Sequence, residues 1–213
     1  MLEGFTHILF DFDGTLCDSI RDIRNAWMTA FDVLGVSCPH FDAVFRNGPP
    51  LLKMTDLLFP DTDAEFRARI VREFKAAYDS SQFENTRPYP GIDGLLKALK
   101  SRGAHLYIAT NKRAKPLGIL LGKCGWDGVF ELTVSPDSFP GVVMDKTALI
   151  GYVLKRSGAA AAAALMVGDT APDIAAGHAN KIHAAGVLWG YGTRAELVGA
   201  GADIILSQED LSL

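Results

Sequence analysis

Three short apolar segments that run directly into small polar residues constrain the fold of this 213-residue chain more than any other feature. The segments and the residues that follow them are 8–10 before Asp11, 106–109 before Thr110, and 165–167 before Gly168 and Asp169. Apolarity that is continuous rather than alternating is typical of strands buried on both faces, as in a parallel sheet. Because ligands of such sheets bind at the carboxyl ends of the strands, these polar residues are expected at the binding edge.

Helical patterns separate these strands along the chain. Leucine and isoleucine recur at helical spacing from Ile92 to a stop at Gly103, and again from Ala148 to a stop near Gly158. Fainter strand candidates are 129–134, 185–189 and 204–206. This alternation predicts an α/β fold with a Rossmann-like, doubly wound parallel sheet.

The stretch from about residue 20 to residue 85 interrupts that alternation. Apolar residues recur at helical spacing in 23–31 and 66–77, and no strand pattern lies between them. Proline and glycine cluster at 47–50 and at 87–91, as in loops and turns. We therefore expect a catalytic core made of residues 1–19 and 86–213, and an inserted helical cap made of residues 20–85.

Composition limits the classes of function. A hydrophobic fraction of 48% and a charged fraction of 22% exclude a disordered chain, and a net charge of −4 makes nucleic acid a poor partner. The longest run of glycine and hydrophobic residues, 158–168, is about half of a bilayer span. Residues 1–10 carry Glu3 and no Lys or Arg, unlike a secretory signal. These features favour a soluble, cytoplasmic protein with no membrane partner.

The three cysteines, Cys17, Cys38 and Cys124, do not form a recognisable motif. Their odd number and irregular spacing are not typical of a disulfide framework or a zinc site. None lies in the loop of a thiol phosphatase, and Cys17 is expected to be a buried thiol.

Two acids follow the first predicted strand, in the run Asp11-Phe12-Asp13-Gly14-Thr15. Residues two apart in a strand face the same side, so both carboxylates are expected to point to one place, and Gly14 permits a sharp exit. The structural alternative is an ordinary turn, for which Asp and Gly are common. Paired carboxylates after a wholly apolar strand favour a cation-binding site, because their burial without a cation is costly.

A second acidic pair, Asp169 and Asp173, follows the strand predicted at 165–167. Proline is tolerated in the first turn of a helix, so Pro172 places Asp173 just inside a helix and Asp169 at the end of the strand. The structural alternative is an acidic helix N-terminus, favoured by the helix dipole. Together the two acidic clusters predict a site for Mg²⁺, which prefers carboxylate oxygens.

Thr110, Asn111 and Lys146 are candidate phosphate ligands. A hydroxyl and backbone N–H groups at a strand-to-helix junction hold phosphate, and a lysine neutralises both phosphate and a neighbouring carboxylate. Thr110 as a helix cap and Lys146 as a solvated surface charge are the structural alternatives. Lys112, Lys115 and Lys123 are rivals for the lysine role, but they lie close to Thr110 in sequence.

In this order, Asp-Phe-Asp-Gly-Thr, a strand ending in Thr, a Lys and Gly-Asp-x-x-x-Asp resemble the four motifs of the haloacid dehalogenase superfamily of phosphotransferases. Finer features are similar to its phosphoglycolate phosphatase-like branch. They are Asp18-Ser19, Gly48-Pro49-Pro50-Leu51, Pro88-Tyr89-Pro90-Gly91 and the run from Gly186 to Gly192. Relatives often have Pro after the motif lysine, whereas Lys146 is followed by Thr147.

The resemblance implies a Mg²⁺-dependent phosphatase of small phosphorylated metabolites. Asp11 would be the nucleophile that forms an aspartyl-phosphate, and Asp13 the general acid and then the base. Asp11, the carbonyl of Asp13, Asp169 and Asp173 would hold Mg²⁺. At about 4 Å and an effective dielectric near 20, each carboxylate repels each phosphate charge by roughly 4 kcal/mol, so the cation and Lys146 are needed.

Several alternatives remain beside this interpretation. A sugar phosphomutase would share the core motifs, but its Ser-Arg cap motif is not found around residues 47–53. A non-catalytic phosphoryl-binding relative would usually lack one of the acids. The run Gly190-x-Gly192-x-x-Ala195 imitates a dinucleotide fingerprint, but too little chain follows it, and Gly118 to Lys123 falls one residue short of a P-loop. The sequence makes no prediction of substrate identity or oligomeric state, and selectivity is expected from the cap near residues 46–53.

Overall fold

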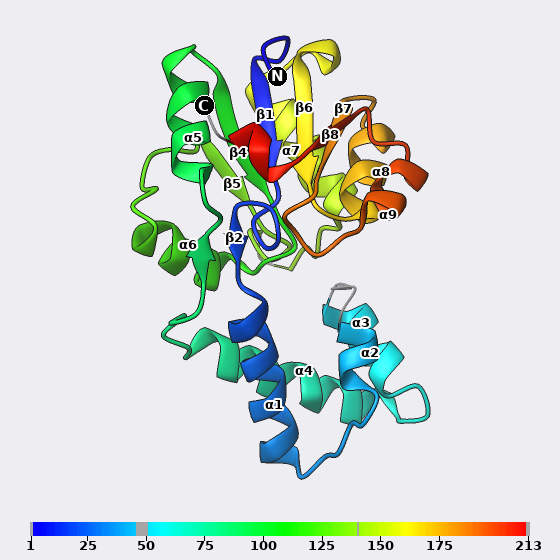
Figure 1. Ribbon diagram of the computed structural model, residues 1–213. Helices are drawn as coiled ribbons and strands as arrows, with labels where there is room; N and C mark the ends of the chain where they lie inside the picture. The colour runs from blue at the N-terminus through cyan, green and yellow to red at the C-terminus, as the bar shows by residue number, and fades with distance from the viewer. Residues whose placement is uncertain (1, 46–50, 140, 212–213) are drawn as a thin grey trace. The chain divides into compact units, whose positions relative to one another are not determined.

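The computed structural model describes residues 2–45, 51–139 and 141–211, and the chain forms two compact units. One unit joins Met1–Asp18 to Arg87–Leu213, and the other is the continuous segment Ser19–Thr86. Figure 1 shows the first as an α/β unit and the second as helices alone. They are called the core unit and the helical unit below.

Among the described residues, the main sheet of the core unit has six strands in the order β5-β4-β1-β6-β7-β8, and every neighbouring pair is parallel. The strands are β1 (His7–Phe10), β4 (His105–Ala109), β5 (Leu132–Val134), β6 (Ala164–Gly168), β7 (His183–Val187) and β8 (Ile204–Leu206). The three segments most strongly predicted as strands are β1, β4 and β6, which are neighbours in the sheet. Their carboxyl ends therefore lie side by side, as the continuous apolar segments predicted.

Helices cover both faces of this sheet. They are α5 (Ile92–Ser101), α6 (Ala114–Lys123), α7 (Lys146–Ser157), α8 (Ala171–Ala179) and α9 (Arg194–Gly199), with short 3₁₀ turns η1 (Ala161–Ala163) and η2 (Gln208–Leu211). Leu9, Tyr107 and Met166 lie side by side on β1, β4 and β6, and they pack in a buried cluster with Leu149 and Val153 of α7. Figure 1 shows α7 behind the sheet and α5 in front of it. The predicted doubly wound α/β fold is confirmed.

A two-stranded antiparallel ribbon, which no sequence pattern predicted, lies where the chain leaves the core unit and where it returns to it. Its strands are β2 (Cys17–Asp18) and β3 (Arg87–Pro88), with Cys17 opposite Pro88 and Asp18 opposite Arg87. Strands of two residues are too short to give a period-2 pattern, so their pairing was not visible in the sequence.

The helical unit contains α1 (Ile20–Leu34), α2 (Phe41–Phe45), α3 (Leu51–Leu58) and α4 (Ala64–Asp79). Its core is aromatic: the rings of Trp27 and Phe74 lie 4.7 Å apart, and Phe31 and Phe41 meet edge to face at 5.4 Å. Such pairs add about 0.5–1.5 kcal/mol each beyond the burial of their area. Most of the predicted cap motif, residues 48–50, lies outside the described residues.

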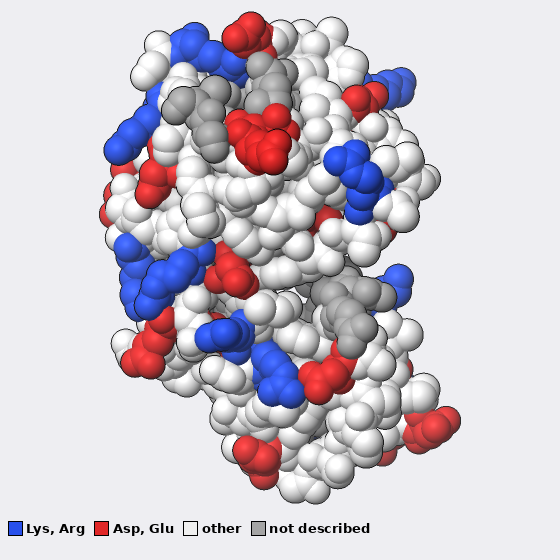
Figure 2. Space-filling model, in the orientation of Figure 1, with Lys and Arg blue, Asp and Glu red and all other residues white. Residues whose placement is uncertain are grey.

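Two properties of the described surface bear on possible partners. In the part of the chain that the structure describes, no helix is both long enough and apolar enough to span a bilayer. Figure 2 shows Lys and Arg side chains interspersed with Asp and Glu side chains on the face in view.

Candidate active site

Asp11 lies directly after the central strand β1, and the neighbouring strands fix its position. Its backbone N–H donates to the carbonyl of Val167 in β6 at 2.9 Å, so the parallel pairing continues one residue beyond the strand. The Asp11 side chain is 13% exposed, and its Oδ2 lies 2.8 Å from Nζ of Lys146. A nearly buried carboxylate at the carboxyl edge of the sheet therefore meets a buried cation.

Lys146 is the first residue of α7 and connects three structural elements. Asp145 caps the helix by accepting the N–H of Ala148 at 2.8 Å, which aims the first turn of α7 at the sheet edge. Nζ of Lys146 lies 2.8 Å from Asp11, 2.8 Å from Oδ1 of Asp173, and donates to the carbonyl of Ala109 at 3.2 Å. Burial alone lowers the pKa of Lys146, but the two carboxylates outweigh it and raise the pKa, so the lysine stays charged.

Lys146 is not a solvated surface charge, because only 6% of its surface is exposed. Its contacts with the carboxylates of Asp11 and Asp173 support the choice of Lys146 as the motif lysine, although Thr147 rather than Pro follows it. The rivals Lys115 and Lys123 are not among the buried residues, whereas Lys112 is buried and takes a different partner, described below.

Asp169 and Asp173 end β6 and begin α8. Oδ1 of Asp169 accepts the hydroxyl of Thr15 at 3.1 Å, and Oδ2 accepts the N–H of Tyr191 at 2.9 Å. Oδ2 of Asp173 accepts both the N–H of Thr170 at 3.1 Å and its hydroxyl at 2.7 Å. Asp173 thus stabilises the first turn of α8 through Oδ2, while its Oδ1 faces Lys146.

Oxygens of Asp11, Asp169 and Asp173 lie within 4.8 Å of one another. Burial raises the pKa of Asp11 to about 6; Lys146 opposes that rise and Asp173 adds to it. Burial, followed by Asp173 and Asp11, raises the pKa of Asp169 well above its ordinary value. Three carboxylates whose hard oxygen donors are directed at one place, two of them with raised pKa values, fit a divalent cation such as Mg²⁺.

Asp13 forms an ion pair with Lys112, whereas Asp11 pairs with Lys146. Its Oδ1 lies 2.7 Å from Nζ of Lys112, whose side chain is 1% exposed against 22% for Asp13. The ammonium group also lies 5.3 Å from the centre of the Phe12 ring. Asp13 is therefore the more accessible end of a buried ion pair.

The turn that carries Asp13 depends on a glycine. Gly14 has a φ of +79°, in the left-handed region that favours glycine, and its missing side chain leaves the space that the Asp169 carboxylate occupies. Its N–H donates to the carbonyl of Cys17 at 2.9 Å. The first acidic loop and Asp169 therefore pack directly against each other.

The predicted phosphate ligands Thr110 and Asn111 follow β4. Thr110 is buried, its hydroxyl accepts the N–H of Lys112 at 3.1 Å, and a side-chain hydrogen bond from Thr110 lowers the pKa of Asp11. It is not the cap of the next helix, because α6 begins at Ala114 with Arg113 at its cap position. Asn111 is half-buried and placed by its position directly after Thr110.

Three contacts at this site were not predicted from the sequence. The pair between Lys112 and Asp13, the Thr15 hydroxyl on Asp169 and the Tyr191 N–H on Asp169 all join distant parts of the chain. The sequence pattern indicates Lys112 only as a rival of Lys146, and residues 190–192 only as a branch feature or an imitation of a dinucleotide fingerprint. The Thr-x-Lys spacing after β4 was the signal that could have identified Lys112.

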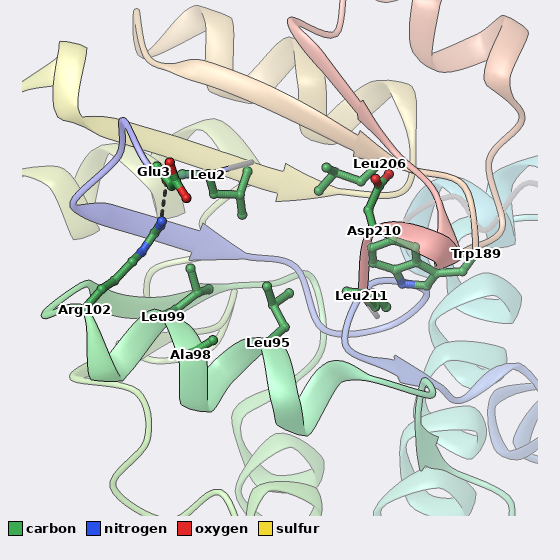
Figure 3. A pocket seen from close by; sticks show the side chains of 10 residues that line it. All are labelled: Leu2, Glu3, Leu95, Ala98, Leu99, Arg102, Trp189, Leu206, Asp210 and Leu211. Carbon is green, nitrogen blue, oxygen red and sulfur yellow. Dashed lines mark hydrogen bonds between the residues drawn. The ribbon is translucent and has the colours of Figure 1, made fainter. Parts of the chain in front are cut away.

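A cavity of the core unit lies apart from the cluster of Asp11, Asp169 and Asp173. Its volume is about 170 Å³, and none of the predicted site residues lines it. Figure 3 shows leucines from α5, the N-terminal segment and the C-terminal segment around it, with Trp189 at one end. The indole N–H of Trp189 donates to the carbonyl of Thr15 at 2.9 Å, so this side chain joins the cavity wall to the loop that follows Gly14.

Comparison with known families agrees with this geometry. The family model described as haloacid dehalogenase-like hydrolase matches residues 8–187, which include the four acids and both lysines of the site. The chain belongs to the haloacid dehalogenase-like hydrolase family. The resemblance inferred from the motifs is thereby confirmed, as is the prediction of an enzyme of the hydrolase class.

Particular relatives extend the similarity over most of the chain. A phosphoglycolate phosphatase of Aquifex aeolicus is 34% identical over 185 residues, which are 86% of this chain and 85% of that protein. Another, from Photobacterium profundum, is 29% identical over 97% of this chain and 93% of that protein. The solved structure of a haloacid dehalogenase-like hydrolase from Streptococcus pneumoniae is 26% identical, covers 99% of this chain and 97% of that one, and has a TM-score of 0.86.

Proposed function

We propose that this protein is a Mg²⁺-dependent phosphatase that hydrolyses small phosphomonoesters through a phosphorylated Asp11. The observation that carries the proposal is the convergence of Asp11, Asp169 and Asp173 at the carboxyl edge of a parallel sheet, where the buried Lys146 pairs with Asp11 and Asp173. Relatives that are about 30% identical over most of the chain and are named phosphoglycolate phosphatases support it.

Asp11 is the proposed nucleophile. Its Oδ attacks phosphorus, the bond from phosphorus to the ester oxygen breaks, and the leaving alkoxide takes a proton. Lys146 stays charged beside Asp11 and helps to neutralise the phosphoryl oxygens as they approach. Thr110 and the backbone N–H of Asn111 complete the proposed phosphate cradle.

Asp13 is the proposed general acid and base. It gives its proton to the leaving oxygen, and the resulting carboxylate then takes a proton from the water that attacks the phosphorylated Asp11. Both steps together return Asp11 and Asp13 to their starting states and release inorganic phosphate. Lys112 holds the Asp13 carboxylate at 2.7 Å, which limits the directions in which it points.

The acidic cluster is the proposed metal site. Asp11, Asp169 and Asp173 would hold Mg²⁺, together with the backbone carbonyl of Asp13. When bound, Mg²⁺ supplies positive charge that offsets the repulsion between these carboxylates and a phosphate dianion.

Residues 20–85 are the proposed cap, and residues 1–19 with 86–213 the proposed catalytic core. The proposed phosphoryl-transfer residues all lie in the core unit, so recognition of the leaving group is assigned to the cap. Phosphoglycolate is the first compound to test, because the relatives are named phosphoglycolate phosphatases. A panel of phosphomonoesters ranked by kcat/KM tests this assignment, and selectivity unchanged after substitutions in α3 would contradict it.

A sugar phosphomutase is the alternative with the same core chemistry. Incubation of the purified protein with a hexose 1-phosphate separates the two, because a phosphatase yields inorganic phosphate and a mutase yields the 6-phosphate isomer. A non-catalytic phosphoryl-binding protein would give neither product with any ester. We expect inorganic phosphate as the product, with turnover that requires Mg²⁺.

A further inference from the structure

Two of the three cysteines lie side by side although 107 positions separate them. Sγ of Cys17 is 3.9 Å from Sγ of Cys124, and both are free thiols. Cys17 begins β2 and is buried, while Cys124 directly follows α6 and is half-buried. Cys38 belongs to the helical unit and has His40 beside it instead.

We propose that Cys17 and Cys124 are a peroxide-sensitive dithiol, which closes to an intramolecular disulfide and slows turnover by displacing the turn that carries Asp13. The effect on turnover rests on the proposed function. Formation of the disulfide does not, because it depends on the two thiols alone.

The geometry requires only a small movement. A disulfide joins its sulfurs at about 2.05 Å, so the two Sγ atoms must approach by about 2 Å. Cys124 is the C-cap residue of α6, and Gly125 follows it with a φ of +70°. A side chain at a helix end, next to a glycine, adjusts more easily than one within a strand or helix.

Cys124 is the thiol that reacts with peroxide first, and Cys17 is the thiol that then forms the disulfide. The hydrogen bond from Cys17 is the largest influence on Cys124 and lowers its pKa, while partial burial opposes the shift. Cys124 is also the more exposed of the two, so a peroxide reaches it first. Cys17 is held next to it as the thiol that resolves the oxidised product.

The reaction has two balanced steps. The Cys124 thiolate attacks one oxygen of hydrogen peroxide, the oxygen–oxygen bond breaks, and a sulfenic acid and hydroxide form. The Cys17 thiol then attacks the sulfenic sulfur, the sulfur–oxygen bond breaks, and water leaves as the disulfide forms. The two sulfurs together lose two electrons, which reduce the peroxide.

Cys17 is connected to the proposed general acid through the backbone. Its N–H donates to the carbonyl of Phe12 at 3.0 Å, and its carbonyl accepts the N–H of Gly14 at 2.9 Å. These two bonds close the turn that contains Asp13. On the other side, the Phe12 ring meets Trp126, two residues beyond Cys124, edge to face at 6.3 Å. Closure of the disulfide therefore pulls on the turn from two sides, through the backbone bonds of Cys17 and through the contact between Trp126 and Phe12.

The test uses the full-length protein, hydrogen peroxide as the oxidant and peptide mapping without reductant. We expect one cross-linked species that joins the peptides containing Cys17 and Cys124, and its loss after treatment with dithiothreitol. The Cys38→Ser variant serves as the matched control and should form the same cross-link. Cys124→Ser should form none, and in Cys17→Ala a sulfenic-acid trap such as dimedone should label Cys124.

Activity on a generic aryl phosphate tests the second half of the proposal. Oxidation should lower kcat roughly tenfold or more in the wild type and in Cys38→Ser, reversibly, but not in Cys124→Ser. No cross-link at peroxide concentrations that label Cys124 in Cys17→Ala would overturn the dithiol. A cross-link without change in kcat would overturn its effect on the Asp13 turn. A protein with no turnover in any redox state, yet with the cross-link, would instead contradict the proposed function.

Discussion

Both units of the molecule bury carboxylates, but they treat them in opposite ways. In the helical unit, Asp22 is buried and accepts the backbone N–H and side-chain groups of Asn85 and Thr86 at 2.7–3.1 Å. In the core unit, Asp11, Asp169 and Asp173 lie close together, and one lysine pairs with Asp11 and Asp173. Neutral hydrogen-bond donors surround the Asp22 carboxylate, whereas the three carboxylates of the core unit are close enough to repel one another.

This difference separates a structural acid from a functional one. The donors on Asp22 tie the start of α1 to the end of the helical unit, and they offset the cost of burying its charge. In the core unit, burial raises the pKa of Asp11 and of Asp169, and the neighbouring Asp173 adds to both shifts, which costs stability unless a cation is bound. Burial of a carboxylate therefore does not by itself identify an active site, whereas mutual repulsion of carboxylates at a strand edge does.

Replacement of Asp11 by Asn should have the largest effect on turnover. Loss of the nucleophile should lower kcat on an aryl phosphate on the order of 10⁴-fold or more. Because the substitution also removes a repelling charge, the thermal midpoint of the metal-free protein should not fall. Steady-state kinetics and thermal unfolding of the same preparation check both outcomes, and turnover near the wild-type value would exclude Asp11 as the nucleophile.

Removal of divalent cations should come next. Treatment with EDTA should lower turnover on the order of 10³-fold, and added Mg²⁺ should restore it. Mg²⁺ should also raise the thermal midpoint of the wild type, and much less that of Asp169→Asn. Full activity after exhaustive chelation would contradict the metal assignment.

Lys146→Met tests the cation at the centre of the acidic cluster. We expect a drop in kcat on the order of 10²-fold, because the phosphoryl oxygens lose a fixed positive charge. The metal-free variant should also be less stable by about 3–5 kcal/mol, since two buried carboxylates lose their partner. Denaturant titration measures the second effect. Stability equal to the wild type would mean that the ion pairs are not formed in solution.

Lys112→Met should have a smaller effect, because Lys112 acts through Asp13 rather than on phosphorus. We expect kcat on an alkyl phosphate to fall about tenfold, with less change on an aryl phosphate, whose leaving group needs little protonation. Lys112→Arg should restore part of the difference. An equal loss on both esters would assign Lys112 to phosphate binding instead.

Asp22→Asn should have the smallest effect on turnover and serves as the matched control for Asp11→Asn. The amide replaces an acceptor oxygen by a donor, so the free energy of unfolding should fall by about 1–3 kcal/mol. The folded protein should keep kcat within about twofold of the wild type, because Asp22 has no proposed part in the chemistry. A loss of kcat comparable to that of Asp11→Asn would remove the distinction between the two kinds of buried acid.

Local pattern was sufficient for the central sheet and for the family. Continuous apolarity located β1, β4 and β6 to within a residue at each end, and the small polar residues after them marked the binding edge. Two of the fainter strands were less well located: the segment expected at 129–134 is a strand only from Leu132 to Val134, and that expected at 185–189 is His183–Val187, whereas the edge strand β8 has its expected bounds, Ile204–Leu206.

The contacts that complete the site could not be predicted in the same way. The pair between Lys112 and Asp13 joins residues 99 positions apart, and the Tyr191 N–H reaches Asp169 only because of the path of a loop. Cys17 and Cys124 come together through the placement of β2, a strand too short to predict. Such contacts depend on the folded path of the chain rather than on the local residue pattern.

Rapid acid quench of the enzyme during turnover, followed by mass spectrometry of its peptides, tests the central claim most directly. We expect one phosphoryl group on the peptide that contains Asp11, increased when Asp13→Asn slows its hydrolysis, and absent in Asp11→Asn. Release of inorganic phosphate by Asp13→Asn with no phosphorylated peptide, or with the phosphoryl group on another residue, would contradict the claim that Asp11 is the nucleophile.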